Sequence, residues 1–310
     1  MWSTLIGNEF VSRLRGRLTY GVLTLLVALF AGLALASFWL VVVTVPTIVP
    51  VIGSSVGSGS SVTIQSIVAS NRGVFLFYTL AICLLAAVFT IAPAVASSAI
   101  SGERENDTFD LLLISGLRAR AIVWGKLLAA VLFVALLAGT ALPGFAIAWM
   151  FGGVSGRDVG LVLIVVGASL AFISAVGLLC SALARSSTLA ALYTYVVVYG
   201  LAIGSLTAYV LGASTQNELV VRPLLSLNPF VALATIPEGI ASSLQQALPY
   251  QYRAVFDPVS YDWPGLSLRY PRWLNTLVLY FTGTIILVLA AGLAIDPCHR
   301  WRTRGERGRA

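Results

Sequence analysis

The stretch VGLVLIVVGASLAFISAVGLLCSALA, residues Val159–Ala184, contains no charged side chain across 26 residues. About 20 helical residues cross the apolar core of a bilayer, so this stretch is long enough to span it. Its residues are continuously apolar rather than alternating, which favours a helix over a barrel strand. The stretch therefore predicts one membrane-spanning helix.

Five further blocks of this kind occur along the chain of 310 residues. The whole chain is 58% hydrophobic and only 10% charged, against about 25% charged residues in a soluble domain. We therefore expect an all-α fold, a polytopic membrane helix bundle with six transmembrane helices, in which residues 1–310 form a single transmembrane domain. The five blocks are Leu18–Val45, Gly73–Ser98, Ala121–Phe151, Ser187–Leu211 and Trp273–Ala294.

Basic residues set the expected orientation. Most of the 19 Lys and Arg residues fall on the cytoplasmic side if both termini are inside, which favours an N-in, C-in topology. Residues 1–17 carry apolar side chains at spacings of three and four, which indicates an N-terminal interfacial helix, with a polar leader as the alternative. The first apolar block continues past Ala34-Leu35-Ala36, so we expect a retained span rather than a cleaved signal peptide. Residues 296–310 would form a basic cytoplasmic tail.

Two local features interrupt the apolar pattern. Pro143-Gly144, late in the third block, predicts a kink or an end of that helix. In the external segment 212–272, Pro223, Pro229 and Pro237 divide the apolar runs into pieces too short to span. These pieces predict short external helices, which either re-enter the outer leaflet or form a plain extracellular cap.

The expected spans hold almost no side chain that could perform chemistry. Lys126 lies near the start of its block, where we expect the long side chain to reach the lipid headgroups. No close carboxylate pair lies within a span, the three cysteines are far apart, and the single histidine, His299, lies in the tail. We therefore predict no catalytic residue, no metal site and no cofactor on this chain. The missing charges at mid-depth also disfavour an ion-coupled carrier or a channel.

Basic residues flank apolar blocks rather than alternating with aromatics, which argues against nucleic acid as a partner and favours membrane lipid. Polar character within the membrane is concentrated in the block Ser187–Leu211. Small residues four apart let helices approach closely, and hydroxyls bond across such contacts. The block either lines a pathway or a dimer seam, or packs as any bundle helix does. The candidate residues are Thr194, Tyr195, Tyr199, Gly200, Gly204 and Ser205.

Charge is concentrated in one cytoplasmic segment, SGERENDTFDLLLISGL, residues 101–117, between the second and third spans. Four acids and an arginine lead a short amphipathic helix that carries Phe109, Leu112 and Leu113 on one face. Such a helix either docks into a groove of a soluble partner or rests on the lipid as a linker. The residues alone leave both interpretations open.

The same segment resembles the coupling segment of ATP-binding-cassette (ABC) exporter permeases of the second class. The matching residues are Glu103-Arg104-Glu105, Thr108, Asp110-Leu111-Leu112-Leu113 and Gly125-Lys126. Asp107 stands where that pattern usually has glycine, and Ser115-Gly116 stands where it has T-P. Asn228-Pro229-Phe230 is similar to another recurrent feature of the family, and the resemblance covers essentially the whole chain.

The resemblance implies a permease subunit of an ATP-driven exporter, a multi-pass protein of the bacterial inner (cytoplasmic) membrane. Its implied partners are an ABC ATP-binding subunit, which would carry ATP-Mg, and a second permease subunit in a homodimer or heterodimer. The chain lacks the phosphate-cradling motif G-x-x-x-x-G-K-[ST], so we do not expect it to be an enzyme. A non-transporting membrane scaffold or accessory subunit is the alternative. The residues implied to bind the ATPase are Glu103, Arg104, Glu105, Thr108, Phe109, Asp110, Leu112 and Leu113.

Overall fold

The structure is a computed structural model. It describes residues 72–108, 119–215, 225–236, 259–263 and 266–295, together with nine isolated positions between Gly21 and Trp39. Five helical segments in this part of the chain are long and apolar enough to cross a membrane. They are formed by α5 (Arg72–Glu105), by α7 (Ala119–Ala138) with η2 (Gly139–Ala141) and α8 (Leu142–Met150), and by α9 (Gly156–Leu183), α10 (Ser187–Thr215) and α15 (Arg272–Ile295).

These segments confirm five of the six predicted spans as helices. A helix is the expected form of such an apolar run, because in lipid the backbone N–H and C=O groups must bond to each other. The first predicted span, Leu18–Val45, lies outside the described residues except for the isolated positions, eight of which are α-helical. Residues 1–17 and 296–310, and most of the charged segment 101–117, also lie outside them.

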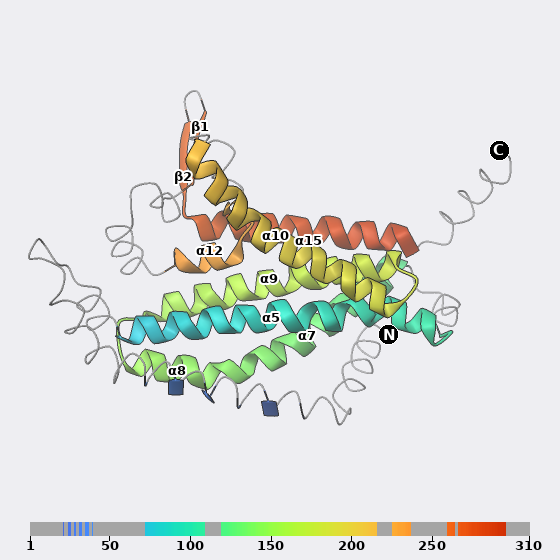
Figure 1. The fold of residues 1–310 in the computed structure, drawn as a ribbon, viewed down its shortest axis with the longest axis horizontal. Coiled ribbons are helices and arrows are strands. Elements are labelled where there is room, and N and C mark those ends of the chain that lie inside the picture. The colour runs from blue at the N-terminus through green and yellow to red at the C-terminus, as the bar shows by residue number, and fades with distance from the viewer. Residues whose placement is uncertain are drawn as a thin grey trace, which may run out of the picture.

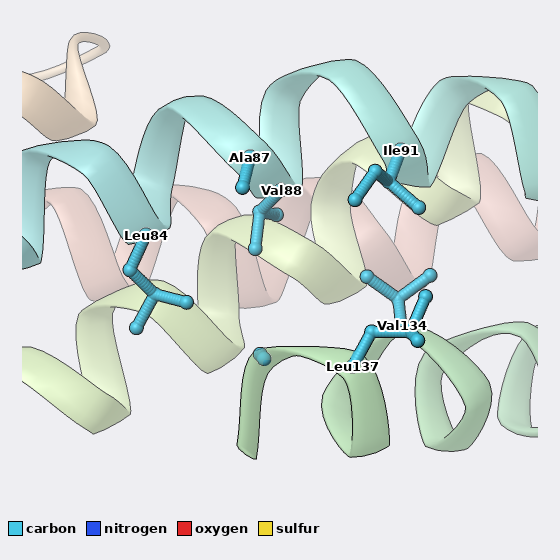
Figure 2. A pocket seen from close by; sticks show the side chains of 7 residues that line it. Leu84, Ala87, Val88, Ile91, Val134 and Leu137 are labelled. Atoms are coloured by element: carbon cyan, nitrogen blue, oxygen red, sulfur yellow. The ribbon is translucent and has the colours of Figure 1, made fainter. Parts of the chain in front are cut away.

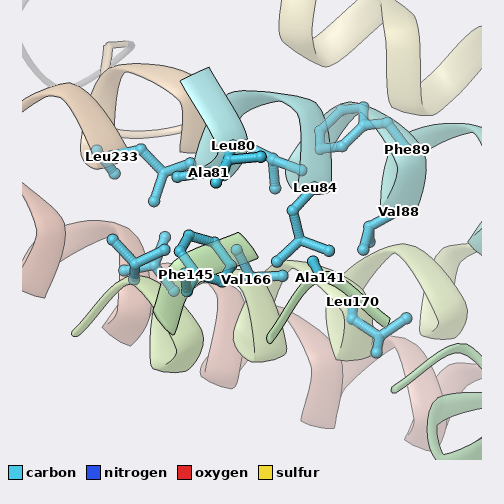
Figure 3. Close-up of a cluster of buried hydrophobic side chains, with 14 of the residues drawn as sticks. Leu80, Ala81, Leu84, Val88, Phe89, Ala141, Phe145, Val166, Leu170 and Leu233 are labelled. Carbon is cyan, nitrogen blue, oxygen red and sulfur yellow. The ribbon is translucent and has the colours of Figure 1, made fainter. Parts of the chain in front are cut away.

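The helix α9 lies at the centre of the bundle. It packs against α5, α7, α10 and α15, and successive spans run in alternating directions (Figure 1). A helix that is apolar on all sides belongs in the interior, and α9 has no charged residue after Asp158. The buried cluster drawn in Figure 3 joins α9 to its neighbours through Leu80, Ala81, Leu84, Val88, Phe89, Ala141, Phe145, Val166, Leu170 and Leu233.

Small residues let α9 and α5 approach each other closely. A Cβ atom placed on Gly177 would lie 2.7 Å from the Cβ of Ala96. One turn further along α9, Ser181 Oγ accepts hydrogen bonds from the backbone N–H groups of Ile100 at 3.0 Å and Ser101 at 2.8 Å. Gly177 and Ser181 thus form a pair of small residues four apart, which is a common packing motif between membrane helices.

The predicted interruption at Pro143 is confirmed. The α-helix α7 ends at Ala138, three residues follow in 3-10 conformation, and α8 begins with Pro143 in its first turn. Proline suits that position because the first N–H groups of a helix have no intrahelical partner. Before this break, apolar side chains of α5 and α7 line a small crevice (Figure 2). Its lining residues are Leu84, Ala87, Val88, Ile91, Val134, Leu137 and Ala138.

The external segment 212–272 contains a short helix, which was predicted, and a β-hairpin, which was not. A short helix, α12 (Pro229–Ala234), packs against α5, α9 and α15. The expectation of an all-α chain is wrong at β1 (Val259–Trp263) and β2 (Leu266–Tyr270), which form an antiparallel hairpin with Trp263 opposite Leu266. Apolar and polar residues alternate in Leu266–Tyr270, and Pro264-Gly265 is a turn-type dipeptide, so the sequence carries the period of a strand there.

Candidate functional site

The last turn of α5, the first turns of α7, the last turn of α9 and the first turn of α10 meet at one end of the bundle, where α15 also ends (Figure 1). This end is called the charged end below. The alternating directions of the spans bring these ends together although they are up to about 80 residues apart in sequence, as in the contact between Ser101 and Ser181. Three consecutive residues predicted as site residues, Glu103, Arg104 and Glu105, lie there.

The second span is longer than predicted, because α5 continues past Ser98 as far as Glu105. The run Glu103–Glu105 is therefore the last turn of a membrane span and does not begin a separate amphipathic helix. Two hydrogen bonds close the end of α5: Thr108 N–H donates to Glu103 O at 3.0 Å and Asp107 N–H donates to Arg104 O at 3.4 Å. This bonding pattern is a Schellman motif, whose residue after the cap is left-handed.

Asp107 occupies that left-handed position, with a φ of 55°. Glycine adopts this conformation without strain, and Asp is one of the few other residues that tolerate it. Asp107 therefore holds a helix ending at which glycine would also fit without strain.

Lys126 on α7 is buried and binds the end of α5. Its side chain is 2% exposed, and its Nζ lies 2.6 Å from Oε1 of Glu103, which is 28% exposed. The same Nζ donates to Ala99 O at 2.8 Å. The expectation that Lys126 reaches the lipid headgroups is therefore wrong, because an ammonium inside the bundle needs a charged partner and finds it in Glu103.

The next two residues bind the turn between α9 and α10. Arg104 Nη1 donates to Ala184 O at 3.2 Å. The Glu105 carboxylate accepts from Ser187 N–H at 2.8 Å and from Ser187 Oγ at 2.6 Å. Ser187 is the first residue of α10, where backbone N–H groups lack intrahelical partners and a negative charge is favourable. Glu105 thus caps α10 from a different helix.

All three residues of the run Glu103–Glu105 therefore bind other parts of the same chain. Thr108, which follows them, is exposed, and its Oγ1 donates to Glu103 O at 3.2 Å. The remaining residues predicted to bind a partner here lie outside the described part of the chain; they are Phe109, Asp110, Leu112 and Leu113.

The candidate residues on α10 divide between its two faces. Thr194 and Ser205 are buried, and Thr194 Oγ1 donates to Ala190 O within its own helix. Gly200 and Gly204 lie on the open face, where an added Cβ would meet no atom within 4 Å. Tyr199 is 37% exposed and borders this face.

Tyr195 has a specific bonding role. Its hydroxyl donates to Thr90 O on α5 at 2.6 Å. Thr90 lies three residues before Pro93, a proline within α5 that has no donor N–H. In an α-helix that N–H would bond the carbonyl four residues earlier, which is that of Phe89 and not that of Thr90. The bond from Tyr195 joins α10 to α5 beside this position, so Tyr195 belongs to the α5–α10 contact.

At the opposite end of the bundle, Asn228 fixes the segment that leads into α12. Its Nδ2 donates to Ala202 O at 3.0 Å and to Ser205 Oγ at 3.1 Å, both on α10. From α15, Thr276 Oγ1 donates to Ser226 O at 2.8 Å and Tyr280 Oη donates to Leu227 O at 2.7 Å. The sequence analysis named Asn228 within a family-like feature and Ser205 as a pathway or seam candidate, but it did not predict that they bond each other. It missed the two α15 hydroxyls, whose spacing of four on one helix face was the available signal.

The fold and its helix ends define a polytopic helical membrane protein. The family model described as "ABC-2 family transporter protein" matches residues 3–295. The chain belongs to this family and is a multi-pass permease of the ABC transporter class. Membership implies a membrane subunit that is generally non-catalytic and that partners, in general, with an ABC ATP-binding subunit. No curated protein matches the chain.

Proposed function

We propose that this chain is the transmembrane permease subunit of an ATP-driven exporter, coupling ATP hydrolysis on a separate ABC subunit to substrate translocation. The family match over residues 3–295 carries the proposal. The charged end faces the cytosol in the orientation that the basic residues favour. The hairpin β1–β2 and α12 then lie toward the outside.

The segment Glu103–Leu113 receives the motion of the ATP-binding subunits. Phe109, Leu112 and Leu113 supply apolar anchors for a groove on the partner, and Thr108 and Asp110 supply polar contacts. The exposure of Thr108 at the end of α5 supports this role. When the ATP-binding subunits close on ATP, displacement of the segment rocks the spans and opens the outward route.

The open face of α10 forms the seam with a second permease subunit and borders the pathway. A smaller share of this span is buried than of any other described span, 22% against 33–56%. The face combines Gly200 and Gly204 with large exposed apolar side chains, among them Val196 and Ile203. A second helix packs closely on a face of this composition.

Affinity purification of the tagged chain from its native membranes tests the partner. An ABC ATP-binding protein should be recovered with the wild type and lost with Phe109→Ser/Leu112→Ser. Leu128→Ser is the matched control, since Leu128 is an exposed apolar residue of α7, 45% accessible, away from the segment. Equal recovery with all three proteins would contradict the docking role.

Oxidative cross-linking in a background without the native cysteines tests the seam. Gly204→Cys lies on the open face and should give a cross-linked permease pair. Ala202→Cys lies two residues away on the buried side, 9% exposed, and should not. Cross-linking of both positions, or of neither, would count against a seam along α10.

A further inference from the structure

The charged end carries one interaction that the family assignment does not explain, the partly buried pair of Lys126, 2% exposed, and Glu103, 28% exposed. It joins the last turn of α5 to the second turn of α7 over 23 positions of sequence. The residues between these two helices, 106–118, include most of the segment Glu103–Leu113 that is proposed to receive the ATP-binding subunits. The pair therefore joins the two helix ends that flank residues 106–118.

The surroundings of Lys126 are apolar. Ala99, whose carbonyl Lys126 binds, belongs to a buried cluster that also contains Val123 and Leu127. Within the described part of the chain, the second carboxylate oxygen of Glu103 is buried without a hydrogen-bond partner. The contact with Lys126 is thus the compensation that the structure gives this carboxylate.

Stability alone gives little reason for such a pair. Buried ion pairs lose much of their attraction to desolvation, and apolar residues of similar size often stabilise a fold equally well. In some proteins such a pair instead fixes the relative position of the two elements that it joins. Here those elements are α5 and α7, the two helices that the segment 106–118 connects.

We propose that Lys126 is a positioning residue for coupling. By holding Glu103, it fixes the ends of α5 and α7 relative to each other, so that a movement of the segment 106–118 is transmitted to the membrane-spanning helices. Without the pair, the same displacement separates α5 from α7 locally and is absorbed there. The inference rests on the proposed function, because it assigns a role within the coupling of that transporter.

The test uses the full-length chain with its co-purified ATP-binding subunit in lipid nanodiscs. The coupling ratio is the ATP hydrolysis rate of the complex divided by that of the ATP-binding subunit alone. The double variant Glu103→Gln/Lys126→Met removes both charges and leaves no unpaired ion, so it should melt like the wild type. Its coupling ratio should fall about fivefold or more, the lower end of typical allosteric couplings.

Two further variants separate coupling from folding. Lys126→Arg keeps the charge and should keep most of the coupling ratio. Arg185→Met removes an exposed cation from the same end of the bundle and should leave the ratio unchanged.

A double variant that retains the wild-type ratio would overturn the proposal, since the pair would then serve stability only. A loss of coupling that Arg185→Met reproduces would overturn it as well, because any lost charge would suffice. Failure of the wild-type chain to recover an ATP-binding subunit is a different result. It would overturn the proposed function and, with it, the role of Lys126.

Discussion

Substituting Gly177 by alanine tests whether the contact between α9 and α5 limits how the bundle packs. The added methyl group would lie 2.7 Å from the Cβ of Ala96, 3.3 Å from its carbonyl carbon and 3.3 Å from Ser97 N. Carbon atoms pack at about 3.5–4.0 Å, so the two helices would have to separate by about 1 Å. Overpacking of this kind costs about 1–3 kcal/mol of unfolding free energy.

Gly167→Ala on the same helix is the matched control, because a Cβ there meets no atom within 4 Å. Both variants gain the same helix propensity, about 1 kcal/mol relative to glycine, so the difference between them isolates the contact with α5. The melting temperatures of both variants are measured in detergent. Unfolding is detected by thiol labelling of the partly buried Cys83 and Cys180. Gly177→Ala should melt below Gly167→Ala, and adding Ala96→Gly should recover most of the difference. A Gly177→Ala protein that melts at or above the control would refute the reasoning.

Substitutions at three other positions probe features that depend on single groups. Tyr195→Phe removes the hydroxyl that donates to Thr90 O and should cost about 0.6–1.7 kcal/mol, the average and the maximum measured for interhelical hydrogen bonds in membranes; an unchanged melting temperature would contradict it. Asn228→Ala should leave the α10 core stable but increase amide hydrogen exchange in residues 225–236, because the bond to Ser205 is lost; equal protection would exclude an anchoring role. Asp107→Gly should be tolerated, whereas Asp107→Val should lower stability by about 1–2 kcal/mol because a branched residue is strained at positive φ; equal melting of the two would argue against the left-handed cap.

The spans could be predicted from the sequence because their signal is local and strong. Apolar length alone identifies a membrane helix, and a proline such as Pro143 marks where one must break. Which helix lies at the centre could not be predicted in this way. Mean hydropathy separates α9, at 2.6, only slightly from three of the other described spans, at 2.3–2.4, and more clearly from α10 alone, at 1.8. The central place of α9 depends instead on close contacts such as that between Gly177 and Ala96.

The charged end shows the same limit. The sequence analysis placed Glu103 and Glu105 in a cytoplasmic segment and assigned them to binding a partner subunit. It could not predict their contacts within the chain, because the partner residues Lys126 and Ser187 lie about 20 and 80 positions further along the sequence. Whether α5 continues past Ser98 is decided by those partners and not by propensity. The hairpin β1–β2 was missed for a different reason, since its alternating pattern is short and stands beside much longer apolar runs.

Successive residues of an α-helix point about 100° apart around its axis. Glu103, Arg104 and Glu105 therefore leave α5 in three directions, toward α7, the end of α9 and the start of α10. Turning the end of α5 about its own axis would break all three contacts together, whereas tilting α5 jointly with its neighbours would break none. This geometry predicts that the end of α5 resists torsion and swings as one unit with the helix ends around it.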